Sequence, residues 1–421
     1  MKYNRTELAE NIGFSSIIDE KFKTGSITVR FITELSGDTS AANAVGVGVL
    51  SASNSTLKTL AELNEKLSSL YGAALSTFAR KRGDVQVLGL SSSWINNRYA
   101  IDGEDVEGEM LGIIRDCIFS PNVQNDEFDE ASFRITKKDL LDRIDAELNN
   151  KRGYALSRAA EIAFDGEPAE NSCYGTKDSA AAVTSAEAYT AYKKLLETAQ
   201  VEIYYISPTE NPAVEAMFRE SFAKIERSPK TCKFRNISPV KNEPLTASDE
   251  FDVRQCKMVL TFKSDSDDLF ALKMLSTIYG ETPVSKLFMN VREKLSLCYY
   301  CACRINGAKG ALMVDSGVER ANIEKAKDEI LRQLDEIRNG NITDDELESA
   351  VLSLDNALSQ IGDTPSSYSG WYFERFCDGR IRTPEEQYED YKNVTKSRII
   401  EAAKTLELDS VYLMLNKEAE N

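Results

Sequence analysis

The sequence predicts an α+β protein made of two similar domains, each an antiparallel sheet packed with helices. Segments rich in β-branched residues alternate with segments whose apolar residues recur at helical spacing, so both kinds of element are expected. The order of these segments then returns in the second half of the chain. With 421 residues, 42% of them hydrophobic, the chain is long enough to form sizeable cores in about two to three domains.

The first half opens with strand-like segments and continues with helical ones. Leucines at helical spacing predict a helix that begins near Ser53 or Ser55 and ends before Gly72. The expected strands cover residues 27–32, 44–50, 75–79, 85–91 and 201–206, and the other expected helices cover residues 104–119, 125–148 and 154–164.

A linker is expected between the halves, because residues 227–248 collect prolines, lysines and polar residues without periodicity. Residues 1–226 then form the first domain and residues 249–421 the second. Asn122 matches Asn341, which lies 219 residues later, and Val201 matches Val411, 210 residues later. Offsets that drift slowly in one direction are typical of a duplicated unit with small deletions. Two such domains facing each other like a clam shell would enclose a chamber for a ligand.

The most informative stretch of the second half reads as a hairpin. Residues 297–305 and 311–318 are strand-like, with a turn rich in glycine between them. A regular alternation would place Tyr299, Cys301 and Cys303 on one face and Cys298 on the other, so the three sulfurs would not converge on a metal. Arg292 lies one or two helical turns upstream, where it could reach the same edge of the sheet as Tyr299.

Composition excludes several classes of function. The net charge of −17 disfavours nucleic acid and anionic membranes as partners. Charges scattered through the N-terminus and dispersed cysteines favour a cytoplasmic protein with reduced thiols. The chain contains no histidine, which removes the usual catalytic triads and the histidine-based zinc sites together.

Residues 291–299, VREKLSLCY, resemble the R-E-x-x-G-L-x-Y signature in the second domain of the pitrilysin, insulin-degrading enzyme and mitochondrial processing peptidase family, with Ser296 where glycine is usual. Residues 70–73 (LYGA) and 83–86 (GDVQ) look like its bacterial, elongation factor P modification-associated branch. The resemblance implies the LuxS and processing-peptidase-like metallohydrolase fold. It also implies that Arg292 and Tyr299 bind the substrate backbone and help stabilise the tetrahedral intermediate.

The family's zinc motif, H-x-x-E-H on a helix, is missing. The corresponding region, about residues 43–48 (NAVGVG), contains neither ligand nor base. The resemblance therefore implies a zinc-less, non-catalytic subunit without catalytic residues, metal ligands or cofactor of its own. A zinc-bearing partner subunit would complete the active site on a peptide substrate, and the chain alone could form a homodimer.

Two alternatives stay open. The chain could be a scaffold that has lost contact with substrate, in which case Arg292 and Tyr299 need not lie together. It could also be an enzyme that holds zinc through carboxylates or thiols alone, which requires three or four converging side chains. Whether the chain is an enzyme at all is therefore undecided by its sequence.

Overall fold

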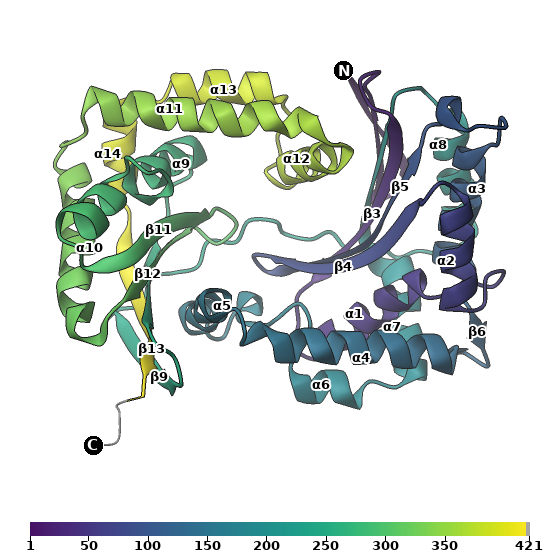
Figure 1. Ribbon diagram of the computed structural model, residues 1–421, viewed down its shortest axis with the longest axis horizontal. Helices are drawn as coiled ribbons and strands as arrows, with labels where there is room; N and C mark the ends of the chain where they lie inside the picture. Colours follow the sequence, from purple (N-terminus) through teal and green to yellow (C-terminus); the bar gives the residue numbers. More distant parts are fainter. Residues whose placement is uncertain (418–421) are drawn as a thin grey trace. The chain divides into compact units, whose positions relative to one another are not determined.

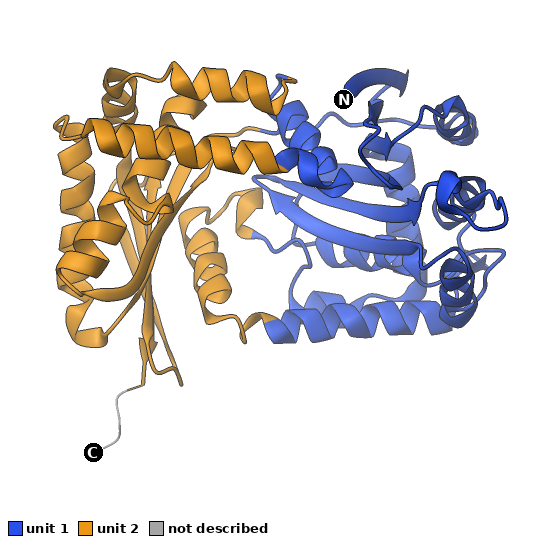
Figure 2. Ribbon diagram, turned by 45° about the horizontal axis from the view of Figure 1, so that its top comes forward, with its two compact units in different colours: residues 1–146, 171–234, 361–380 blue, residues 147–170, 235–360, 381–421 orange. Residues whose placement is uncertain are grey.

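The computed structural model describes residues 1–417 and forms two compact units (Figures 1 and 2). Unit 1 comprises residues 1–146, 171–234 and 361–380, and unit 2 comprises residues 147–170, 235–360 and 381–421. Each unit thus takes most of its residues from one half of the chain and one segment from the other half. No helix within residues 1–417 has the length and apolar character needed to cross a membrane.

Unit 1 is a six-stranded sheet with the order β1-β2-β8-β3-β5-β4. All neighbours are antiparallel except β2 and β8, which are parallel. The strands are β1 Lys2–Ala9, β2 Ile12–Ile18, β3 Thr24–Glu34, β4 Ala74–Arg82, β5 Val85–Ile95 and β8 Gln200–Ser207, with a small hairpin of β6 Val123–Gln124 and β7 Glu127–Phe128. The helices are α1 Ser40–Gly48, α2 Leu60–Ser69, α3 Val106–Phe119, α4 Glu130–Glu147, α6 Lys177–Ala182, α7 Ser185–Thr198, α8 Pro212–Phe222 and α12 Pro365–Cys377.

Unit 2 is a five-stranded sheet with the order β11-β12-β10-β13-β9. Only β13 and β9 are parallel. The strands are β9 Leu245–Phe251, β10 Cys256–Lys263, β11 Cys298–Asn306, β12 Ala311–Val318 and β13 Glu407–Asn416. The helices are α5 Lys151–Ala163, α9 Leu269–Ser276, α10 Ile323–Arg338, α11 Asp344–Ser359, α13 Pro384–Lys392 and α14 Lys396–Lys404, with two π-helical segments, η4 Thr277–Glu281 and η5 Leu287–Lys294.

The two sheets share one topology. Once β1 is set aside, β2-β8-β3-β5-β4 of unit 1 corresponds strand by strand and direction by direction to β9-β13-β10-β12-β11 of unit 2. The chain is therefore an α+β protein with antiparallel-rich sheets backed by helices, as the sequence predicts. The hairpin expected at residues 297–305 and 311–318 is confirmed as β11 and β12.

The segment that each half contributes to the other unit is a helix lying on a sheet. Helix α5 from the first half packs on β10 and β13, and α12 from the second half packs on β3 and β8. Both helices are followed by a glycine with positive φ, Gly166 at 78° and Gly379 at 73°. On unit 1, Arg30 of β3 lies between the rings of Tyr204 and Phe373, so α12 covers its sheet through aromatic and cation–π contacts.

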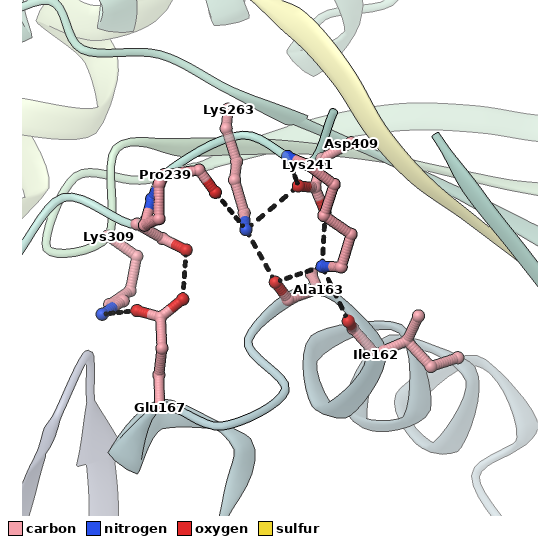
Figure 3. Close-up of polar contacts among 9 residues, drawn as sticks. Ile162, Ala163, Glu167, Pro239, Lys241, Lys263, Lys309 and Asp409 are labelled. Atoms are coloured by element: carbon pink, nitrogen blue, oxygen red, sulfur yellow. Dashed lines mark hydrogen bonds and ion pairs between the residues drawn. The ribbon is translucent and has the colours of Figure 1, made fainter. Parts of the chain in front are cut away.

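Buried charges hold α5 against the second sheet (Figure 3). Asp409 of β13 is fully buried and pairs with Lys263 at 3.0 Å and Lys241 at 3.2 Å. The Lys263 ammonium also donates to the carbonyl oxygen of Ala163, the last residue of α5, at 2.7 Å. Lysines at a helix C-terminus bond carbonyls that lack a partner within the helix and oppose the negative end of its dipole.

Three local expectations were wrong. Residues 44–50 are not a strand: they belong to α1 and the 3₁₀ turn after it, because their small and branched residues reflect burial on several sides of a helix. The helix expected from Ser53 or Ser55 begins only at Leu60, where Thr59 caps it in a reciprocal capping box with Glu62. The helix expected from Asn125 begins at Glu130, after the small β6–β7 hairpin.

Gly46 is required by the close approach of α1 and α7. A methyl group added there would lie 2.6 Å from the backbone oxygen of Ala188, which cannot move cheaply. We expect Gly46→Ala to lower the free energy of unfolding by about 1–3 kcal/mol. Gly112 in α3 is the matched control, because a methyl there meets nothing within 4 Å. Urea unfolding should show Gly112→Ala gaining about 0.5–1 kcal/mol from helix propensity, and equal effects of both variants would contradict the packing argument.

The charged cluster on Asp409 makes a second prediction. Lys263→Met removes the donor that Ala163 and Asp409 share, so we expect a loss of about 3 kcal/mol in the free energy of unfolding. Lys404→Met is the control, because Lys404 pairs with Glu401 on the exposed surface of α14, and it should change stability by less than about 0.5 kcal/mol. Thermal unfolding of both variants measures the difference, and similar melting temperatures would refute a stabilising role.

Candidate functional site

The site that the sequence predicts lies where η5 meets β11, in unit 2. The turn between them closes through hydrogen bonds from Ser296 N to Arg292 O at 3.1 Å and from Leu297 N to Val291 O at 3.0 Å. Ser296 adopts the left-handed conformation, with φ of 51°, as residues just past a helix end often do. This explains why the signature that the chain resembles has glycine there: glycine reaches that conformation without a steric cost.

A β-bulge at the start of β11 overturns the predicted alternation of faces. Cys298 lies opposite Val318, Tyr300 opposite Gly317 and Cys301 opposite Ser316, so Tyr299 is the extra residue. Because Val318 and Ser316 are two residues apart, Cys298 and Cys301 share one face of the strand. The placement of Tyr299 with Cys301 and Cys303 was therefore wrong: the three cysteines are buried, and Tyr299 is 61% exposed.

Arg292 lies near the end of η5 with its side chain 41% exposed. Its guanidinium lies 4.6 Å from the ring centre of Phe288, one turn earlier, and its Nε is 3.6 Å from a carboxylate oxygen of Glu293. These contacts orient the side chain and leave its outer face open to solvent. An exposed guanidinium of this kind can donate to a carbonyl or carboxylate oxygen.

The phenol of Tyr299 donates a hydrogen bond to Glu319 Oε1 at 3.1 Å. This hydrogen bond raises the pKa of Tyr299 and so favours the protonated form, which acts as a donor. Glu319 follows β12 directly and was not recognised in the sequence, because its place opposite Tyr299 depends on the bulge. The carboxylate partner of Arg292 is thus Glu293, and that of Tyr299 is Glu319.

The two predicted residues lie at the same end of β11. The positive charge of Arg292 contributes to lowering the pKa of Cys298, the neighbour of Tyr299, after a larger effect from the Cys301 thiol. The short turn joins the helix end that carries Arg292 to the start of β11, and the electrostatic effect acts between the same two places. Arg292 and Tyr299 therefore both lie near Cys298 in the chain, Arg292 with a partly exposed side chain and Tyr299 with an exposed one.

The region that corresponds to the missing zinc motif lies on α1, where neutral amides form the polar contacts. Asn43 Nδ2 donates to Gln86 Oε1 at 3.0 Å, and Gln86 Nε2 donates to the carbonyl oxygens of Ser40 and Cys173. Both amide side chains are buried. Within residues 1–417, no three histidine, cysteine, aspartate or glutamate side chains gather so as to hold a metal ion.

A pocket of about 290 Å³ on unit 1 was also missed by the sequence reasoning. It lies over β3, β4 and β5 beside the start of α12, and its walls carry mostly hydroxyl groups. Its lining residues are Thr24, Ser26, Ala74, Ser76, Ser91, Ser92, Ser93, Pro365 and Ser366. The three consecutive serines at residues 91–93 are the sequence feature that could have indicated this pocket.

Taken together, the fold and the site define an α+β protein of two similar sheets, in which a partly exposed arginine and an exposed tyrosine flank the start of one strand, and residues 1–417 hold no metal-binding cluster. Residues 182–354 match the family model described as "Peptidase M16 inactive domain". The chain is 28% identical over 404 residues to "Probable inactive metalloprotease YmfF" of Bacillus subtilis strain 168, covering 95% of this chain and 94% of that protein.

Two solved structures share the fold of this chain. A conserved protein from Enterococcus faecalis V583 is 25% identical with a TM-score of 0.92, and a peptidase M16 inactive domain from Pseudomonas fluorescens is 16% identical with a TM-score of 0.80. Each comparison covers 100% of both chains. The chain is thus similar to the M16, or insulinase-like, peptidases over residues 182–354, and along 95% of its length to a protein described as a probable inactive metalloprotease.

Ser296 carries a conformational cost that can be measured. A side chain in the left-handed region costs about 1–2 kcal/mol, and part of this is offset because glycine gains freedom in the unfolded chain. We therefore expect Ser296→Gly to raise the free energy of unfolding by up to about 1 kcal/mol. Ser353→Gly, inside the right-handed helix α11, should lower it in the same urea titration. Destabilisation by Ser296→Gly would show that its side chain contributes more than the backbone strain costs.

Proposed function

We propose that this chain is a zinc-less, non-catalytic subunit that binds peptide through Arg292 and Tyr299 and completes the active site of a zinc-bearing insulinase-like partner. The observation that carries the proposal is the contrast between two regions of the chain. The helix where the family places its zinc motif presents Asn43 in a buried amide network, whereas Arg292 near the end of η5 is partly exposed and Tyr299 at the start of β11 is exposed.

The chemistry of the pair fits a peptide backbone. A guanidinium and a phenol are both hydrogen-bond donors, and both suit a carbonyl oxygen that gains negative charge when water attacks it. Their carboxylate partners, Glu293 and Glu319, hold the two donors in place without burying them. When substrate binds, the guanidinium and the phenol would leave these carboxylates and donate to the substrate instead. Zinc and the activated water would come from the partner subunit.

The alternative is a scaffold without substrate contact. It is favoured by the same carboxylates, because a paired arginine and a paired tyrosine are also what an ordinary surface contains. The third possibility, zinc held by carboxylates or thiols alone, has no support, because residues 1–417 contain no suitable cluster.

Three further statements belong to the proposal. We infer that the units arose by duplication, which their common strand order and the drifting sequence offsets support. The cytoplasm is the proposed location, which the free cysteines of the described residues support. Nucleic acid and membranes are not proposed as partners, given the charge of −17, and a homodimer is proposed for the chain alone.

The test is peptide cleavage by this chain, by a zinc-bearing M16 relative from the same cell, and by their mixture. We expect the chain alone to be inert, the mixture to cleave, and Arg292→Ala or Tyr299→Phe to lower kcat/KM of the mixture by about tenfold to a thousandfold. Arg332→Ala removes an exposed, carboxylate-paired arginine elsewhere in unit 2 and should change nothing.

Metal analysis runs beside the activity assay, with zinc expected in the partner alone. If the mixture cleaves but neither substitution slows it, the pair does not contact substrate. If this chain adds no activity, the scaffold alternative replaces the proposal, and stoichiometric zinc with cleavage by this chain alone would refute it.

A further inference from the structure

Three neighbouring strands of unit 2 bring a phenol and an ammonium group together. Tyr300 of β11 lies opposite Gly317 of β12, and Lys257 of β10 lies opposite the same glycine from the other side. The ring of Tyr300 lies over this glycine, because a methyl group added at Gly317 would be 2.5 Å from a carbon of the ring. The Lys257 ammonium is 5.3 Å from the ring centre, so the two side chains share one face of the sheet.

Two arginines reach the same face from different elements and meet on the buried carboxylate of Asp315. Arg152, in the first turn of α5, donates to both oxygens of Asp315, with its Nη2 3.1 Å from Oδ1. Arg304 of β11 donates from its Nη2 to the same Oδ1 at 3.1 Å. The Arg152 guanidinium also lies 4.6 Å from the centre of the Tyr300 ring, so the ion pairs and the phenol form one cluster.

The cluster holds more positive than negative charge. Arg152, Arg304 and Lys257 are three cations, and Asp315 is the one carboxylate that pairs with them among residues 1–417. The Lys257 ammonium donates to Gln255, which is an uncharged amide. Burial lowers the pKa of Lys257, and the charge of Arg152 lowers it further, so the ammonium would be stabilised by another negative charge. A local excess of positive charge contrasts with the net charge of −17 of the whole chain.

The same side chains keep hydrogen-bond donors to spare. The hydroxyl oxygen of Tyr300 is buried and has no hydrogen-bond partner within the part of the chain that the structure describes. Arg152 uses Nε and Nη2 on Asp315 and Arg304 uses only Nη2, which leaves further N–H groups on both guanidinium groups. The two arginine side chains are 44% and 50% exposed, so these donors can be reached from solvent. Because a buried hydroxyl normally has a partner, an incoming acceptor would complete the cluster.

A carboxylate is the acceptor that suits these donors best. It is planar and accepts parallel hydrogen bonds from a guanidinium group. It brings a single negative charge, whereas a phosphate dianion would place more negative charge beside Asp315. The positive end of the α5 dipole, in the turn that carries Arg152, also favours an anion at this place.

We propose that this cluster, defined as Arg152, Lys257, Tyr300 and Arg304, binds a carboxylate of the peptide, from an acidic side chain or from a free C-terminus. The inference rests on the proposed function for the kind of ligand, a peptide, but the binding itself needs only this chain. Tyr300 directly follows Tyr299 in β11, and consecutive Cα atoms lie about 3.8 Å apart, so a peptide held at Tyr299 passes near the cluster.

Isothermal titration calorimetry with the full-length chain tests the site. Three acetylated octapeptides of alanine, serine and leucine are compared: one with a central glutamate and an amidated C-terminus, one with glutamine in its place, and the glutamine peptide with a free C-terminal carboxylate. We expect at least one acidic peptide to bind about tenfold more tightly than the neutral one, because its carboxylate accepts charge-assisted hydrogen bonds. The ratio of the two acidic peptides shows which source of the carboxylate the site prefers.

Two conservative variants locate the effect. Lys257→Met removes the ammonium and leaves the ion pairs of Asp315 in place, and Tyr300→Phe removes only the hydroxyl. We expect the preference for the acidic peptide to fall below about threefold in Lys257→Met and to weaken in Tyr300→Phe. Lys404→Met removes an exposed lysine of α14 and should keep the full preference. Urea unfolding of each variant verifies that it is folded.

The outcomes also separate this site from the proposed function. The site is rejected if all three peptides bind equally, if none binds, or if the preference survives both Lys257→Met and Tyr300→Phe. Weaker binding of every peptide in Arg292→Ala, with no preference for acidic peptides in the wild type, would keep the proposed function and reject the site. A preference that Arg292→Ala leaves intact and Lys257→Met abolishes would support the site even if the mixture with the partner does not cleave.

Discussion

The carboxylate of Asp409 is the group around which unit 2 is assembled. It is fully buried on the central region of the second sheet, and two lysines from different parts of the chain converge on it. One of them, Lys263, is itself 3% exposed and reaches both the end of α5 and the carbonyl oxygen of Pro239. Burial lowers the pKa of Lys263, and its ion pair with Asp409 opposes this effect. A buried charge of either sign would be costly without its partner. Strand β13, the segment that carries Lys241 and helix α5 therefore have to assemble together.

Two backbone irregularities, only three residues apart, then build the candidate site on this framework. The left-handed Ser296 ends η5 and turns the chain into β11, and the bulge at Tyr299 aims the phenol away from the core while its neighbours stay buried. Arg292 and Tyr299 therefore owe their exposure to backbone geometry.

The sequence predicted most of the elements, but not the local geometry around Arg292 and Tyr299. Periodicity found the β11–β12 hairpin and α5, because their apolar residues face one core. It failed at residues 44–50, where Gly46 and its valine neighbours are buried in a helix that touches α7, and burial on several sides hides the helical period. It failed again at Tyr299, because one extra residue in a strand reverses every later side chain, and no residue type marks a bulge of this kind. Glu319 was missed for the same reason.

The exchange of α5 and α12 has a consequence for how the protein is made. The sheet of unit 1 ends with β8 near residue 207, yet the helix that covers its second face is not synthesised until residues 365–377. During translation the emerging first half therefore has an incomplete fold, with the aromatic surface around Tyr204 open until α12 arrives. Domains normally fold as they leave the ribosome. Here unit 1 cannot be completed before α12 is made, so a ribosome stalled earlier in the second half would leave both units unfinished at once.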